Sequence, residues 1–80
     1  MEKTIAVVAI MVSDKDSVER INALLHNFGE YIIGRIGVPY RERNLSVISV
    51  IMDAPQPVIN SLSGKLGMIN GVSSKVLITK

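Results

Sequence analysis

The chain contains 80 residues, of which 48% are hydrophobic and 4% aromatic, and nine basic and seven acidic side chains give a formal net charge of +2. This length predicts a single domain over residues 1–80, with a core small enough to need support from disulfides, metals or self-association. The sequence has no cysteine, which excludes disulfides and thiolate metal sites and leaves self-association. The nearly balanced charge does not indicate nucleic-acid binding, and no apolar run is long enough for a membrane-spanning helix. We expect a cytoplasmic protein.

The first predicted element is a β-strand over residues 3–12. Apolar side chains occupy both parities of this segment, which is typical of a strand buried on both faces. An N-terminal signal peptide is the alternative. However, the apolar run spans only about eight residues and lacks a clear small-residue cleavage site. The polar residues 13–17 then predict a loop.

A helix is predicted to follow this loop and to run to about Phe28. Asp16, with Glu19 three residues later, matches a capping box at its start. One apolar stripe at helical spacing consists of Val18, Ile21, Leu24, Leu25 and Phe28. We expect Gly29 to end the helix in a left-handed conformation.

Two further strands are predicted over residues 31–38 and 45–53. Gly34 and Gly37 weaken the first of them, which favours an edge strand or a bulge. Pro39 is expected to end it and to begin a solvated turn. The second strand is apolar on both parities, like the strand over residues 3–12, so both are expected in the middle of one sheet.

The last two predicted elements are a helix beginning near Pro55 and Pro57 and a strand over residues 72–79. Proline is tolerated in the first turn of a helix. The residues expected on one apolar helix face are Val58, Ile59, Leu62 and Leu66. Gly67 is the expected helix end. The final strand alternates, with Val72, Val76 and Ile78 expected to point inward.

This order of elements predicts an α+β, ferredoxin-like βαββαβ sandwich, with two helices on one face of a four-stranded antiparallel sheet. The other face of the sheet would then expose apolar residues of both inner strands to water. We therefore expect a homo-oligomer, a dimer or a tetramer, that covers this face sheet on sheet or by strand extension. The alternative is that long polar side chains such as Lys3 and Lys75 cover it.

The sequence contains no recognisable catalytic constellation, cofactor motif or metal site. The ligand-binding candidates are Asp14, Asp16, Arg35, Tyr40 and Arg41, with Lys15 and Arg43 as further basic side chains. Arginine pairs well with phosphate or carboxylate, whereas helix capping and a solvated hairpin tip would also explain these residues. A lone histidine, His26, cannot build a typical metal site within one chain.

Two segments resemble a known family. The segment RIGVPYRERNLSVISVIMDAP (35–55), followed by LGMINGVSSKVLI (66–78), is similar to the iron-only hydrogenase system regulators. The resemblance implies an ACT-like fold related to the C-terminal domain of nickel-responsive repressors, which tetramerises and binds nickel through histidines and a cysteine. This chain offers only His26, so no nickel ligands are transferred, and direct nucleic-acid binding is not expected.

Three functions are compatible with these features. The first is a non-enzymatic regulatory or ligand-sensing module of an iron-only hydrogenase system. It would act as a homo-oligomer, with a small effector near residues 13–17 or near Arg35, Tyr40 and Arg41. The second is a structural protein–protein interaction module that recruits a partner through an exposed sheet edge. The third is a metal sensor that uses His26 from several subunits.

Overall fold

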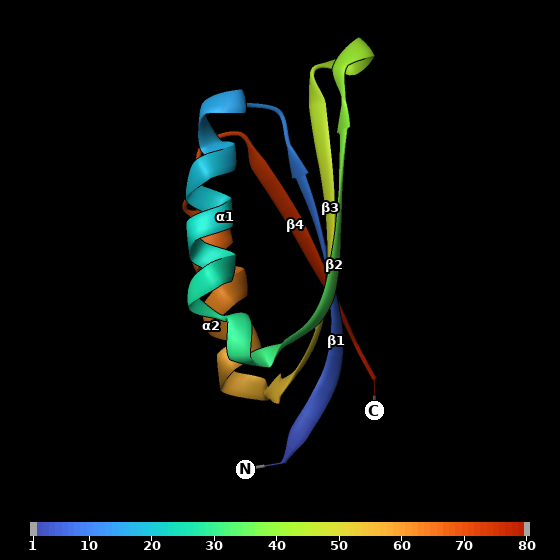
Figure 1. The fold of residues 1–80 in the computed structure, drawn as a ribbon. Helices are drawn as coiled ribbons and strands as arrows, with labels where there is room; N and C mark the ends of the chain where they lie inside the picture. Colours follow the sequence, from blue (N-terminus) through green and yellow to red (C-terminus); the bar gives the residue numbers. More distant parts are fainter. Residues whose placement is uncertain (1, 80) are drawn as a thin grey trace.

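A computed structural model describes residues 2–79 and contains four strands and two helices in the predicted order. The strands are β1 (Lys3–Val12), β2 (Ile32–Tyr40), β3 (Leu45–Pro55) and β4 (Val72–Ile78), and the helices are α1 (Val18–Asn27) and α2 (Gln56–Gly67). The strands form one antiparallel sheet in the order β2-β3-β1-β4, and both helices lie on the same side of it (Figure 1). The predicted α+β, ferredoxin-like fold is confirmed.

The strand pairing places the two most apolar strands inside the sheet. β1 pairs with β3 over its whole length and with β4 from Ala6 to Val12. β2 and β4 form the two edges of the sheet. The glycines of β2 and the alternation of apolar and polar residues in β4 indicated this. The register of β2 shifts between Ile32 and Gly34, which is the irregularity that a glycine in a strand favours.

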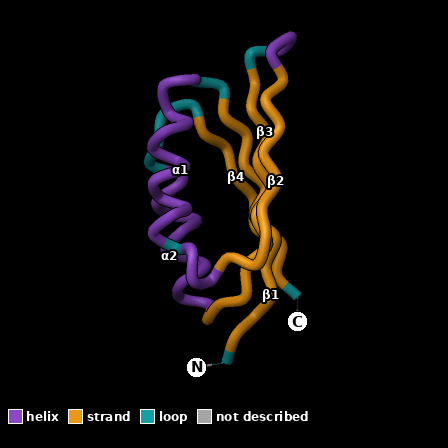
Figure 2. The backbone as a smooth tube through the Cα atoms, in the orientation of Figure 1, coloured by secondary structure: helices purple, strands orange, loops and turns teal. Residues whose placement is uncertain are grey.

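The core lies between the sheet and the two helices (Figure 2). One parity of each inner strand points toward the helices, because successive side chains of a strand alternate between its faces. The buried strand residues are Ala6, Val8, Ile10, Val12, Ile48, Val50, Met52 and Ala54. The buried helix-side residues are Ile21, Leu25, Phe28, Ile59, Leu62 and Leu66. Both predicted helical stripes therefore face the core.

The opposite face of the sheet carries no helix (Figures 1 and 2). Seven large apolar side chains of this face are 39–72% exposed, and we call the surface that they form the open face. They are Ile5, Met11, Ile36, Val38, Tyr40, Ile51 and Leu77. These side chains remain exposed although Lys3 and Lys75 belong to the same sheet. The two lysines therefore do not cover the open face, which was the alternative to a homo-oligomer.

The start of α1 differs from the predicted capping box. Asp14, not Asp16, provides a cap, because its carboxylate accepts a hydrogen bond from the backbone N–H of Asp16 at 3.0 Å. A 3₁₀ turn over Lys15–Ser17 follows, and Ser17 makes no capping bond at the start of α1. Its hydroxyl instead donates to the carbonyl of Asn70 at 2.7 Å. Asp16 lies inside the short turn and therefore cannot cap the helix.

Two other predicted boundaries are also wrong. Gly29 does not adopt a left-handed conformation, because a right-handed 3₁₀ turn over Gly29–Tyr31 leads the chain from α1 toward β2. Pro39 does not end β2, which continues to Tyr40. A proline is tolerated there because β2 is an edge strand, where a missing N–H need not break the ladder.

Candidate functional site

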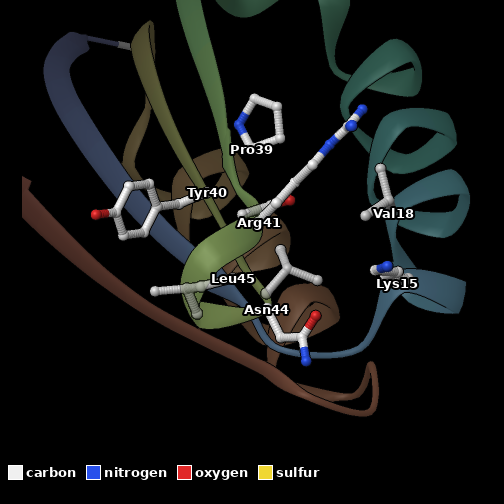
Figure 3. Close-up of a pocket in the computed structure, with 9 residues that line it drawn as sticks. Lys15, Val18, Pro39, Tyr40, Arg41, Asn44 and Leu45 are labelled. Atoms are coloured by element: carbon white, nitrogen blue, oxygen red, sulfur yellow. The ribbon is translucent and has the colours of Figure 1, made fainter.

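A hollow of about 380 Å³ lies between the far end of the β2–β3 hairpin and the start of α1 (Figure 3). The hairpin continues beyond the helix layer at this end of the sheet (Figure 1). We call this hollow the hairpin pocket. Its lining consists of Val12, Lys15, Val18, Pro39, Tyr40, Arg41, Asn44, Leu45 and Ser46.

Two short turns bring the polar lining residues to the pocket. The hairpin closes through a 3₁₀ turn over Arg41–Arg43, and Asn44 follows with a φ of 51°. Asparagine tolerates this left-handed conformation better than most residues do. The backbone N–H of Asn44 donates to the carbonyl of Arg41 at 3.2 Å, which fixes the turn. On the other side, the 3₁₀ turn before α1 supplies Lys15.

The pocket combines an apolar floor with a cationic rim. Val12 is buried at the end of β1 and Val18 is half-buried in the first turn of α1. The cations Lys15 and Arg41 come from opposite walls, and no carboxylate is part of the lining within residues 2–79. In Figure 3, Arg41 extends from the hairpin toward α1. This arrangement is suited to a small ligand with a negative charge and an apolar portion.

The structure brings only two of the five predicted ligand-binding residues to this pocket. Tyr40 and Arg41 line it, although the Tyr40 hydroxyl points away from α1 in Figure 3 and donates to the carboxylate of Glu42 at 3.3 Å. Asp14 and Asp16 belong to the turn before α1 and are not part of the lining.

Arg35 has a structural partner elsewhere. Its guanidinium donates to the side-chain oxygen of Asn22 at 2.7 Å, which ties β2 to α1. Arg35 pairs across the sheet with the buried Val50, so it emerges on the helix side. Arg35 was predicted as a ligand-binding candidate, and in the structure its guanidinium is paired with the amide oxygen of Asn22 on the neighbouring helix.

Two polar lining residues, Asn44 and Ser46, were not predicted, and Lys15 was named only as a further basic side chain beside the five candidates. Lys15 had a sequence signal, because it is a basic residue in the predicted loop over residues 13–17, and loops often carry functional residues. The contributions of Asn44 and Ser46 depend on how the hairpin is placed relative to α1, which no local pattern encodes.

Within residues 2–79, no group of three or more histidine, cysteine or carboxylate side chains could hold a metal ion. His26 is exposed on α1. Among the helices of the same part of the chain, none has the length and apolar character needed to span a membrane.

The fold and the pocket define a small ferredoxin-like domain with one sheet face uncovered. Residues 4–76 match the model of a family described as "TM1266-like: Iron-only hydrogenase system regulator, putative". The chain belongs to this family, as its two sequence motifs indicated. A search of curated proteins finds no match.

Two solved structures place the fold among known proteins. The uncharacterized protein TM1266 from Thermotoga maritima superposes with a TM-score of 0.94 at 39% sequence identity, covering 99% of this chain and 100% of that protein. A formyltetrahydrofolate deformylase from Pseudomonas putida KT2440 superposes with a TM-score of 0.61 at 15% identity. That match covers 92% of this chain but 28% of the deformylase, so it concerns the fold alone.

Proposed function

We propose that this protein is a non-enzymatic regulatory module that acts as a homo-oligomer in an iron-only hydrogenase system and responds to a small effector. The observation that carries the proposal is the uncovered open face, because it requires a partner and a second copy supplies one. The description of its family supports the regulatory part of the proposal. The pocket lining, which combines cations with neutral polar groups, supports binding more than catalysis.

The energetics of the open face favour a covering partner. Burying one large aliphatic side chain completely is worth about 1.5–3 kcal/mol, and seven large apolar side chains of this face are at least 39% exposed. A contiguous apolar patch of this kind is unusual on a monomer. Extension of the sheet through the β2 or β4 edge would leave these side chains in water. Stacking of two sheets would cover them.

The size of the face is consistent with a sheet-on-sheet dimer. Four strands about 4.8 Å apart, each contributing about seven residues at 3.3 Å, give a face of roughly 450 Å² in projection. Two copies then bury about 900 Å², and the corrugation of the side chains increases this area. The sum is close to the roughly 1,000 Å² that a specific interface needs. A second copy therefore offers both the required chemistry and the required area.

Tyr40 connects the proposed interface to the hairpin pocket. Its side chain belongs to the open face, and the residue also lines the pocket. An effector that changes the position of the hairpin end would therefore change the interface in the same step. Such a shared residue gives a regulatory protein a direct way to convert ligand binding into a change of assembly.

The first prediction concerns the oligomeric state in solution. Light scattering should give a multiple of 8.7 kDa for the native protein. The double variant Ile36→Lys/Leu77→Lys should dissociate into 8.7 kDa monomers. Each lysine would place an unpaired charge in the apolar interface, which should weaken association at least about 100-fold. Both side chains are exposed in the single subunit, so the subunit itself should stay folded.

Met68→Lys is the matched control. Met68 is 84% exposed but lies after α2, away from the open face, so this variant should keep the native mass. A native protein that is monomeric at high micromolar concentration would refute the proposed assembly. Equal dissociation of the control and the double variant would refute the assignment of the interface.

A further inference from the structure

We infer that the hairpin pocket binds a small organic carboxylate, with the anionic group between Lys15 and Arg41 and the aliphatic part against the apolar floor. This inference deepens the proposed function, because it gives the chemical class of the effector. It rests on the pocket lining alone, and its test is independent of the oligomeric state.

The charge distribution of the lining favours an anion. Lys15 and Arg41 come from two separate turns that face one cavity, and the described lining contains no acidic side chain to neutralise them. An anion bound between these two exposed cations would be attracted by both of them. The neutral side chains of Asn44 and Ser46 can donate further hydrogen bonds to the same group.

The identity of the second cation favours a carboxylate over a halide. The guanidinium of arginine presents its N–H groups in a planar fork that matches two carboxylate or phosphate oxygens. Arg41 lines the pocket, and its side chain extends from the hairpin toward α1 (Figure 3), the element that carries the opposite wall. The turn before α1 and the first residue of α1 supply Lys15 and Val18 to the wall opposite Arg41.

The size and the floor of the pocket restrict the rest of the ligand. Its volume of about 380 Å³ is near the lower end of ordinary ligand sites, which favours a molecule of few carbons over a nucleotide. Val12, Val18 and Pro39 supply an apolar surface beside the cations. A fully hydrated inorganic anion would leave that surface unused, whereas a short aliphatic chain would cover it.

A titration of the full chain with butyrate, followed by ¹⁵N NMR at constant ionic strength, tests this inference. We expect saturable shifts confined to the amides of Lys15, Val18, Arg41 and Ser46, with a dissociation constant on the order of 1 mM for about six non-hydrogen atoms. Butyramide, which has the same shape without the charge, should bind at least about tenfold more weakly.

The variant Arg41→Gln should weaken butyrate binding at least about tenfold, because it removes the charged fork and keeps a polar side chain. Arg43→Gln is its matched control. Arg43 belongs to the same 3₁₀ turn but does not line the pocket, so this variant should bind butyrate like the native protein. The spectra also report whether each variant is folded.

Several results would overturn the inference. These are no saturable shift with butyrate, equal binding of butyramide, shifts located away from the pocket, or equal losses in both arginine variants. Binding of inorganic phosphate without binding of butyrate would overturn the assignment to a carboxylate. None of these results would alter the mass measured by light scattering, so a failure here is distinguishable from a failure of the proposed assembly.

Discussion

Replacing Gly71 by alanine is expected to destabilise the protein by about 2–4 kcal/mol, because the position combines a left-handed backbone with a close contact. Gly71 has a φ of +73°, a conformation that residues with a Cβ atom rarely adopt. A Cβ added there would lie 2.7 Å from the Cβ of Asp14 and 3.2 Å from the hydroxyl of Ser13. A small backbone shift that relieved the close contact with Asp14 would still leave the alanine in a left-handed conformation.

The tight contact at Gly71 exists because β4 starts directly against the loop that follows β1. The backbone N–H of Ser13 donates to the carbonyl of Gly71 at 2.8 Å, and its hydroxyl donates to the same oxygen at 3.2 Å. Lys15, two residues after Ser13 in the same loop, lines the hairpin pocket. A displaced loop should therefore also disturb the pocket, in addition to lowering the free energy of unfolding.

Thermal unfolding monitored by circular dichroism provides the measurement, with Gly64→Ala as the matched control. For a domain of this size, a loss of 2 kcal/mol lowers the melting temperature by about 10 °C. Gly64 lies inside α2, and a Cβ there would meet nothing within 4 Å. Alanine at that position should stabilise the helix by about 0.5–1 kcal/mol. Equal effects of the two variants would contradict the role assigned to Gly71.

Replacing Leu62 by alanine is expected to cost about 2–5 kcal/mol of stability, which is the usual range for truncating a fully buried leucine. Leu62 is 0% exposed and lies on the face of α2 that packs on the sheet, beside Ile59 and Leu66. A core of this size has few other side chains that can move into the space. The loss should therefore include both the lost burial and the cavity that remains.

Ser61→Ala is the control for this second experiment. Ser61 is the preceding residue of α2 and is exposed, so its substitution should change the free energy of unfolding by less than about 0.5 kcal/mol. Chemical denaturation of both variants at one protein concentration gives the comparison, because self-association would otherwise contribute to the measured stability. A loss below about 1 kcal/mol for Leu62→Ala would contradict its place in the core.

The sequence by itself determined which elements form and which strands lie inside the sheet. Both parities of residues 3–12 and 45–52 are apolar, and this pattern requires cover on two faces wherever the strand is placed. The helical stripes around Ile21 and Leu62 and the alternation in the last strand are equally local, because 3.6-residue and two-residue periods are properties of the backbone. The sequence also predicted the apolar open face, and the exposed side chains of the sheet agree with it.

Only the tertiary structure decided the details that depend on contacts between distant segments. A left-handed glycine was expected at Gly29, but the glycine with a positive φ is Gly71, where β4 begins beside the loop at Ser13. The hairpin pocket likewise combines the ends of β1, α1, β2 and β3. Which residues line the pocket depends on how far the hairpin extends past the helix layer. The register between β2 and β3 sets that distance. Local periodicity does not contain this information, so Tyr40 and Arg41 were predicted for the site whereas Asn44 and Ser46 were not.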